Sequence, residues 1–153
     1  MSQSNLAPYA NDIDEKEDHK DHVYIVTRME KYREAYTSGK WANLLEFYDP
    51  TNCLYQDFHT DTPSVGYEGL RERYERLFGC FADYSIETSS IHGNKGFTAW
   101  EWEATGKLLL DLDTGGMLAK EDAPLRKMVG ATLMWWEGDK ITKSHDYMHQ
   151  KPV

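Results

Sequence analysis

The sequence predicts an α+β domain in which helices pack on one face of a curved antiparallel sheet. In the first half of the chain, apolar residues recur at spacings of three and four, which is the period of an amphipathic helix. After residue 81 the spacing changes to two, which is typical of strands with one buried face. Near the C-terminus, two runs rich in β-branched and aromatic residues flank Gly138-Asp139, the pattern of a tight β-hairpin.

Length and composition favour one folded domain behind a short polar tail. The chain has 153 residues, which is enough for a single domain with a hydrophobic core. Residues 1–21 are charged, mostly acidic and poor in apolar side chains, so we expect a disordered acidic N-terminal tail. Residues 22–150 carry the periodic patterns and form the predicted domain.

The net charge indicates which partners are not expected, and the cysteine content and the lack of a long apolar run indicate the compartment. With 26 acidic and 17 basic residues, the formal net charge is −9 at pH 7. Nucleic acids and anionic membrane surfaces attract positive proteins, so neither is an expected partner. Cys53 and Cys80 form no disulfide framework, and no apolar run approaches the ~20 residues that span a bilayer. The chain is therefore expected to be cytoplasmic.

Three helices are expected before most of the sheet. The first covers residues 22–38 and the second residues 40–48, which Asp49-Pro50 ends. The third follows Gly69, with its charged residues Arg71, Glu72, Arg73, Glu75 and Arg76 on the predicted outer face. The side chains predicted to turn inward are Ile25, Met29, Tyr32, Tyr36, Trp41, Leu44, Leu45, Tyr48, Leu70, Tyr74, Leu77, Phe78 and Phe81.

Five strands are expected, at residues 53–58, 83–91, 96–110, 125–137 and 140–149. The last four follow one another through short turns or a loop, so they should form an antiparallel meander. In the first strand, Tyr55 and Asp57 are two residues apart and therefore share a face.

The hairpin at Gly138-Asp139 sets a predicted register for the last two strands. If Glu137 pairs with Lys140, one face consists of Val129, Ala131, Leu133, Trp135, Thr142, Ser144, Asp146 and Met148. Asp146 is the carboxylate of this mostly apolar face, where desolvation raises the pKa of an unpartnered carboxyl. It is therefore a candidate acid or base. The alternative is an Asp at a frayed strand end that is either solvated or paired with His145 or His149.

Asp57 and Glu103 are the candidate partners of Asp146. If these carboxyls share one cavity, they cannot all ionise, so one keeps its proton as an acid while another acts as a base. Such a pair suits proton transfer in isomerisation, ring closure, dehydration or epoxide opening. His59, in the loop after the first strand, is a further catalytic candidate, and a solvated loop histidine is the alternative.

Aromatic residues supply candidate walls and hydrogen-bond donors for a hydrophobic substrate. The predicted substrate-binding residues are Tyr32, Tyr36, Trp41, Tyr55, Glu101, Leu133 and Trp135. Ordinary core packing explains the rings as well. Trp102 is a further plausible pocket wall. If Glu101 and Glu103 face inward instead, Trp100 and Trp102 face outward, and an aromatic outer face predicts a homodimer. No phosphate-loop, dinucleotide or zinc motif occurs, so neither a cofactor nor a metal is expected.

Several segments in order resemble the NTF2-like superfamily, in particular its SnoaL-like polyketide cyclases and limonene-epoxide-hydrolase-like enzymes. The segments are Tyr36 to Lys40 with Trp41-Ala-Asn-Leu-Leu-Glu-Phe-Tyr-Asp-Pro50, Leu54-Tyr-Gln-Asp57, Gly66-Tyr-Glu-Gly-Leu70, Trp100-Glu-Trp-Glu-Ala-Thr-Gly106 and Gly138-Asp-Lys-Ile-Thr-Lys-Ser-His-Asp-Tyr147. The likeness spans about residues 22–149. It implies a cone-shaped NTF2-like fold, in which a bent sheet closed by three N-terminal helices opens at one end into an apolar pocket.

The resemblance also implies roles for residues. The Asp in the last strand of such enzymes acts in acid/base chemistry, and its counterpart is Asp146. In the epoxide hydrolase branch a Tyr and an Asn on the first strand hold a water, and Tyr55 and Asp57 occupy those positions. That branch also uses an Arg and an Asp on the long middle strand, where this chain has Glu101 and Glu103. The cyclase branch uses a His on the strand before the last, and residues 125–137 contain none.

The sequence therefore predicts a cofactor-independent isomerase or cyclase that acts on a hydrophobic polyketide- or terpenoid-like intermediate of secondary metabolism. The first alternative is a dehydratase, in which His59 donates to a leaving hydroxyl, or an epoxide hydrolase of the same fold. The second alternative is a non-catalytic module that binds a small molecule or takes part in assembly.

Overall fold

A six-stranded sheet with strand order β2-β1-β6-β5-β4-β3 is the frame of the structure. The computed structural model describes residues 15–58 and 63–152. The strands are β1 (Leu54–Asp57), β2 (Ser64–Val65), β3 (Phe81–Asn94), β4 (Phe97–Leu108), β5 (Leu125–Glu137) and β6 (Lys140–Lys151). β3 to β6 form the predicted antiparallel meander. β1 joins its edge in parallel with β6, and β2 pairs with β1.

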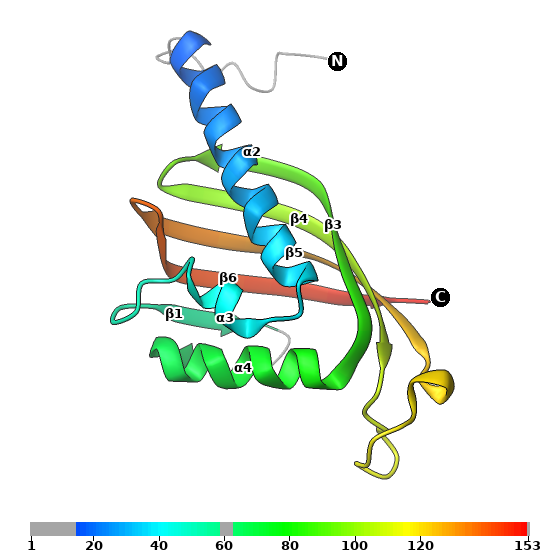
Figure 1. Cartoon of the computed structure of the whole chain (residues 1–153). Helices are drawn as coiled ribbons and strands as arrows, with labels where there is room; N and C mark the ends of the chain where they lie inside the picture. The colour runs from blue at the N-terminus through cyan, green and yellow to red at the C-terminus, as the bar shows by residue number, and fades with distance from the viewer. Residues whose placement is uncertain (1–14, 59–62, 153) are drawn as a thin grey trace.

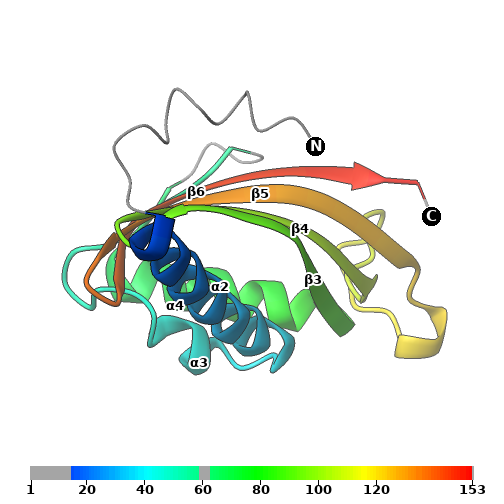
Figure 2. The same ribbon diagram turned by 90° about the horizontal axis from the view of Figure 1, so that it is seen from above.

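The helices cover the concave face of this curved sheet (Figures 1 and 2). They are α2 (Glu15–Thr37), α3 (Trp41–Leu45) and α4 (Gly66–Cys80), and a short 3-10 turn, η2 (Lys120–Asp122), lies in the loop after β4. α2 crosses the sheet on this side, and α4 runs along its open edge below β1 (Figure 1). The predicted α+β class, with three helices before most of a curved sheet, is confirmed.

α2 begins at Glu15, earlier than the predicted start at residue 22. The helix boundary therefore differs from the predicted one: residues 15–21 belong to α2, and residues 1–14 lie outside the described part of the chain. Glutamate and lysine are good helix formers, and extending an existing helix costs far less than nucleating one, so a charged segment next to a buried helix stays helical. No helix in the described ranges, α2 included, has the length and apolar character needed to cross a membrane.

The hairpin between β5 and β6 contains a bulge, and beyond the bulge the pairing is shifted by one residue from the predicted register. Glu137 pairs with Lys140 as predicted, and Gly138 has φ of 59° in the turn. Trp136 then pairs with Ile141 but Trp135 with Lys143, so Thr142 is an extra residue in β6. Because side chains alternate between the two faces of a strand, one extra residue in β6 shifts the pairing by one. The residues of β5 that share a face with Asp146 are then the ones that were predicted to lie on the opposite face. The inner row of β5 is therefore Met128, Gly130, Thr132, Met134 and Trp136.

The register corrects the predicted faces of β4 as well. Trp100 and Trp102 are 1% and 5% exposed and face the helices. Glu101 and Glu103 consequently lie on the outer face. The aromatic residues of that outer face are Phe58, Phe97, Trp135 and Tyr147, and His145 packs among them. The predicted homodimer stays a prediction, and the tryptophans on which it was based belong to the core.

Three tyrosines from three elements join the helices in the core. Tyr32 of α2, Tyr48 after α3 and Tyr74 of α4 are each at most 1% exposed. Their hydroxyl oxygens lie 2.8 Å apart for Tyr32–Tyr48, 3.1 Å for Tyr32–Tyr74 and 2.8 Å for Tyr48–Tyr74. A buried hydroxyl without a partner is costly, so this triangle allows three polar groups to lie in an apolar core.

Removing one hydroxyl from the triangle should destabilise the fold. We expect Tyr48→Phe to lower the free energy of unfolding by about 1–3 kcal/mol, because it leaves buried hydroxyls of Tyr32 and Tyr74 short of a partner. Urea unfolding measures this loss. Tyr147→Phe, on the exposed outer face, is the control and should stay within about 0.5 kcal/mol of the unmodified protein. Equal effects of the two substitutions would contradict this role of the triangle.

Candidate active site

A cavity of about 320 Å³ lies between α4 and the concave face of the sheet. Its wall is mostly aromatic and aliphatic and holds two carboxylates and two arginines. The lining residues are Tyr36, Asp57, Arg73, Arg76, Leu77, Cys80, Phe81, Tyr84, Ile86, Trp100, Trp102, Leu108, Leu110, Met128, Asp146, Met148 and Gln150. An apolar cavity with a few converging polar groups is the usual form of a small-molecule site.

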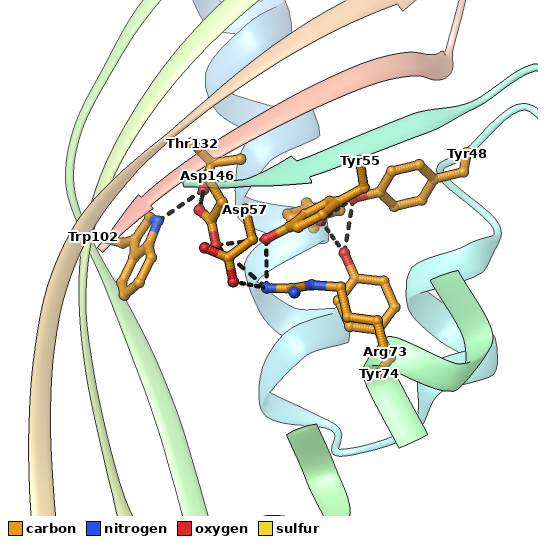
Figure 3. Close-up of polar contacts among 9 residues, drawn as sticks. Tyr48, Tyr55, Asp57, Arg73, Tyr74, Trp102, Thr132 and Asp146 are labelled. Atoms are coloured by element: carbon orange, nitrogen blue, oxygen red, sulfur yellow. Dashed lines mark hydrogen bonds and ion pairs between the residues drawn. The ribbon is translucent and has the colours of Figure 1, made fainter. Parts of the chain in front are cut away.

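The two aspartates of the cavity come from neighbouring strands. β1 and β6 pair in parallel with Asp57 beside Asp146, so both side chains extend from the same face of the sheet. They are 5% and 7% exposed. Figure 3 shows the two carboxyls close together beside the Arg73 guanidinium. Their proximity follows from strand pairing, since they are far apart in the sequence.

Both oxygens of the Asp146 carboxyl accept hydrogen bonds from buried hydroxyls. Tyr55 donates to Oδ2 at 2.6 Å and Thr132 donates to Oδ1 at 2.5 Å. The indole N–H of Trp102 donates to the Thr132 hydroxyl at 2.9 Å, which leaves the Thr132 proton directed at Asp146. These contacts hold the carboxyl in one orientation and favour its ionised form (Figure 3).

Arg73 places a positive charge beside both aspartates. Its Nη2 donates to Asp57 Oδ2 at 3.0 Å and to the Tyr55 hydroxyl at 2.8 Å, and lies 3.8 Å from Asp146 Oδ2. The guanidinium carbon lies 4.0 Å from the centre of the Tyr55 ring. Arginine keeps its charge when partly buried, so it offsets the repulsion between two close carboxylates.

The pKa of Asp146 is shifted upward by its surroundings. Burial raises the pKa of this carboxyl, while the hydrogen bonds from Thr132 and Tyr55 and the charge of Arg73 lower it, and the nearby Asp57 raises it. Burial is the largest of these effects, so the net shift is upward. A carboxylate with a raised pKa is a stronger base than an ordinary aspartate.

Gly130 allows Trp102 to reach Thr132. A Cβ at Gly130 would lie 2.5 Å from the Trp102 ring and 2.5 Å from the Tyr147 carbonyl oxygen. The indole therefore lies directly over the backbone of β5, where its N–H meets the Thr132 hydroxyl. The absence of a side chain at this position is what sets the cavity wall next to Asp146.

The structure brings together some of the residues that the sequence singled out. Asp57, Asp146 and Tyr36 line the cavity, and Tyr55 is hydrogen-bonded to Asp146 directly behind them. These positions agree with the predicted site, and the catalytic roles stay predictions.

Other predicted site residues lie elsewhere. Glu103 is on the outer face, 3.5 Å from Lys127 Nζ, and Glu101 shares that face, so neither carboxyl reaches the cavity. The register bulge likewise turns Leu133 and Trp135 outward. Tyr32 belongs to the buried tyrosine triangle, and Trp41 packs near Arg71 with its ring centre 5.3 Å from the guanidinium carbon. His59 lies outside the described residues.

Two polar residues of the site were missed: Arg73 and Thr132. Arg73 was assigned to the outer face of its helix because it is charged. Its spacing of three from Leu70 and four to Leu77 places it on the inward stripe, so a signal was present in the sequence. Thr132 was assigned to the wrong side of its strand, and the bulge at Thr142 explains this error. For Trp102 both orientations were left open, and the structure places it in the cavity wall.

In the described ranges, no group of three or more His, Cys, Asp or Glu side chains is arranged to hold a metal ion. The ordered donors around the cavity are hydroxyl, indole and guanidinium groups. The arrangement is suited to taking up a proton at Asp146 and to stabilising negative charge on a substrate oxygen near Arg73.

Solved structures with the same fold support this reading of the architecture. SalBIII, described as an epoxide hydrolase/cyclase-like enzyme in pyran ring formation in the polyether salinomycin, has a TM-score of 0.68 and 14% identity, covering 84% of this chain and 93% of its own. A protein from Shewanella denitrificans OS-217, described as a SnoaL-like polyketide cyclase, has a TM-score of 0.67 and 12% identity over 80% and 88%. These likenesses confirm the NTF2-like fold.

The sequence comparisons agree with the fold. Cyclase aurE from Calcarisporium arbuscula is 24% identical over 124 residues, which are 80% of this chain and 85% of that protein. A family model described as the SnoaL-like domain matches residues 29–144, which include the C-terminal part of α2 and the cavity-lining residues from Tyr36 to Met128. Asp146, Met148 and Gln150 of β6 lie just beyond the matched segment. The chain belongs to the SnoaL-like domain family.

Proposed function

We propose that the protein is a cofactor-independent acid/base enzyme, an isomerase or cyclase, that acts on a hydrophobic polyketide intermediate in secondary metabolism. The observation that carries this proposal is the buried carboxyl of Asp146, which faces an apolar cavity and accepts hydrogen bonds on both oxygens. The similarity to cyclase aurE and to SalBIII supports the reaction class.

Asp146 is the proposed base. In its ionised form it removes a proton from a substrate hydroxyl, or from a carbon next to a carbonyl, and the raised pKa of Asp146 makes this transfer more favourable. Thr132 and Tyr55 hold the carboxyl while it changes its protonation state. The protonated Asp146 then returns the proton to another atom of the substrate, so an isomerisation or ring closure leaves the enzyme unchanged.

Arg73 is the proposed stabiliser of negative charge. Its guanidinium lines the cavity next to both aspartates, where a substrate oxygen gains charge as the proton is removed. Such charge is stabilised most strongly by donors that are already in place before the reaction. The ion pair with Asp57 and the contact with Tyr55 hold the guanidinium in that position.

Opening of an epoxide is the second candidate reaction, and the position of Arg73 favours it. The expected middle-strand arginine is absent from this chain, but Arg73 brings a guanidinium between two carboxylates from α4 instead. Attack by the substrate's own hydroxyl would close a ring without a change of mass, and attack by water would add one water. SalBIII, which has a similar fold, is described as an epoxide hydrolase/cyclase-like enzyme.

The direct test uses the intermediate that accumulates when the gene is deleted in its host. Purified protein is incubated with this metabolite in buffer treated with EDTA and free of organic cofactors, and the product is followed by mass spectrometry. Unchanged mass with a new retention time indicates isomerisation or cyclisation, and a gain of one water indicates epoxide hydrolysis. Loss of one water indicates a dehydratase. A metabolite that is returned unaltered would support a binding module.

Asp146→Asn should abolish turnover. We expect a loss of about 10²- to 10⁴-fold in kcat, because the amide cannot take up a proton. Binding of the substrate, measured by quenching of tryptophan fluorescence, should persist, since Trp100 and Trp102 line the same cavity. Glu103→Gln is the control, because Glu103 lies on the outer face. If Glu103→Gln is as inactive as Asp146→Asn, the proposed site is wrong.

Arg73→Gln should reduce kcat by about 10²-fold, the size expected for removing a donor that stabilises charge in the transition state. The matched control is Arg71→Gln on the exposed face of the same helix, where Arg71 pairs with Glu68 and Glu75. Steady-state rates of both variants should be measured beside their unfolding curves. A full-rate Arg73→Gln enzyme would remove Arg73 from the mechanism.

Thr132→Val should shift the pH dependence of kcat/KM to higher pH. The Thr132 hydroxyl lowers the pKa of Asp146, so removing it raises that pKa. A base works in its ionised form, and kcat/KM therefore rises as pH increases through the pKa of Asp146. In Thr132→Val this rise should occur at higher pH. Thr132→Ser keeps a hydroxyl at this position, so kcat/KM should rise at the same pH as in the unmodified protein. A shift to lower pH would contradict Asp146 as the base.

A further inference from the structure

The open end of the cavity carries arginine side chains that the proposed reaction does not use. Arg76 lies on α4 one turn after Arg73 and lines the cavity, but unlike Arg73 it is exposed. In the described part of the chain Arg76 makes no ion pair, whereas Arg71 pairs with Glu68 and Glu75, and Arg73 with Asp57. Its charge is therefore available at the rim.

Arg126 lies on β5 close to residues of the cavity wall, although it is not itself among the lining residues. It lies two residues before Met128, which is buried and lines the cavity, so both side chains share the inner face of β5. Arg126 pairs with Gly106 of β4, and a Cβ at Gly106 would lie 2.9 Å from Phe81, a cavity residue. The Nε of Arg126 is buried and has no hydrogen-bond partner within the described ranges. A buried donor of this kind is costly unless a ligand or water satisfies it.

The charges of the cavity are separated along its length. Among the described residues of the wall, the acidic side chains are Asp57 and Asp146, which lie at the deep end with Arg73. The other charged lining residue is Arg76, which is exposed, and the exposed Gln150 of β6 also lines the cavity. The middle of the wall is apolar and aromatic. This order matches a molecule with an apolar body and an anionic group at one end.

We propose that the substrate is an amphipathic carboxylate, whose acidic group is held at the rim by Arg76 and Arg126 while its apolar body extends to Asp146. This inference rests on the proposed function only in taking the cavity as the substrate site. Guanidinium groups match the planar carboxylate with paired N–H donors, and repulsion keeps such a group away from the two aspartates at the deep end. The rim arginines thus fix which end of the substrate reaches Asp146.

A fluorescent polyene acid tests this assignment without knowledge of the natural substrate. cis-Parinaric acid and its methyl ester have the same apolar chain, and the dissociation constants of both are measured by fluorescence with the full-length protein. We expect the acid to bind about tenfold or more tightly than the ester at low salt, as for hydrogen bonds to a charged group. In the Arg76→Gln/Arg126→Gln double variant the acid should lose this advantage and the ester should be unaffected.

Arg71→Gln is the control, because it removes a positive charge from the other face of α4 and should change neither constant. Equal binding of acid and ester to the unmodified protein would overturn the inference, as would an acid affinity that the double variant leaves unchanged. Both results leave the proposed function intact, since the cavity still takes an apolar ligand. Binding of neither compound would overturn the inference and also count against the cavity as a hydrophobic substrate site.

A salt titration keeps the test decisive if the double variant does not fold. Raising the KCl concentration screens exposed charges, so the acid should lose about tenfold in affinity for the unmodified protein while the ester does not. Loss of affinity for both compounds, or for neither, would contradict a carboxylate held by rim arginines.

Discussion

The parallel pairing of β1 with β6 is the constraint on which the site depends. It places Asp57 beside Asp146 on one face of the sheet, in a region where both side chains are almost fully buried. Two carboxylates so close together repel each other in a low dielectric, so the arrangement requires a positive charge nearby. Arg73 supplies that charge from α4, which ties the position of the helix to the chemistry of the sheet edge.

The surrounding core serves the same arrangement. The tyrosine triangle joins α2, the segment after α3 and α4, and so fixes the helix that carries Arg73. On the other side, Gly130 lets the Trp102 indole lie against β5, and the indole orients the Thr132 hydroxyl toward Asp146. Structural and functional hydrogen bonds thus form adjoining networks within one core.

Much of the fold and part of the site were predictable from local patterns. The helices, the meander and the hairpin pairing of Glu137 with Lys140 follow from periodicity and turn residues. Asp146 was recognisable as the carboxylate of a mostly apolar face of the predicted hairpin, and Asp57 as the residue that shares a strand face with Tyr55. Arg73 also lay on the inward stripe of its helix, but its charge led to an outward assignment, because charged residues are buried only where a partner compensates them.

The sequence by itself determined the fold class, the period of each element and the two aspartates, because these depend on neighbours within a few residues. The tertiary structure decided which faces of β4 and β5 line the cavity, and it decided the partners of Asp146. A single extra residue at Thr142 exchanges the faces of β5, and no local pattern reveals such a bulge. The pairing of β1 with β6 and the ion pair of Arg73 with Asp57 join segments far apart in the chain, so only packing could bring them together.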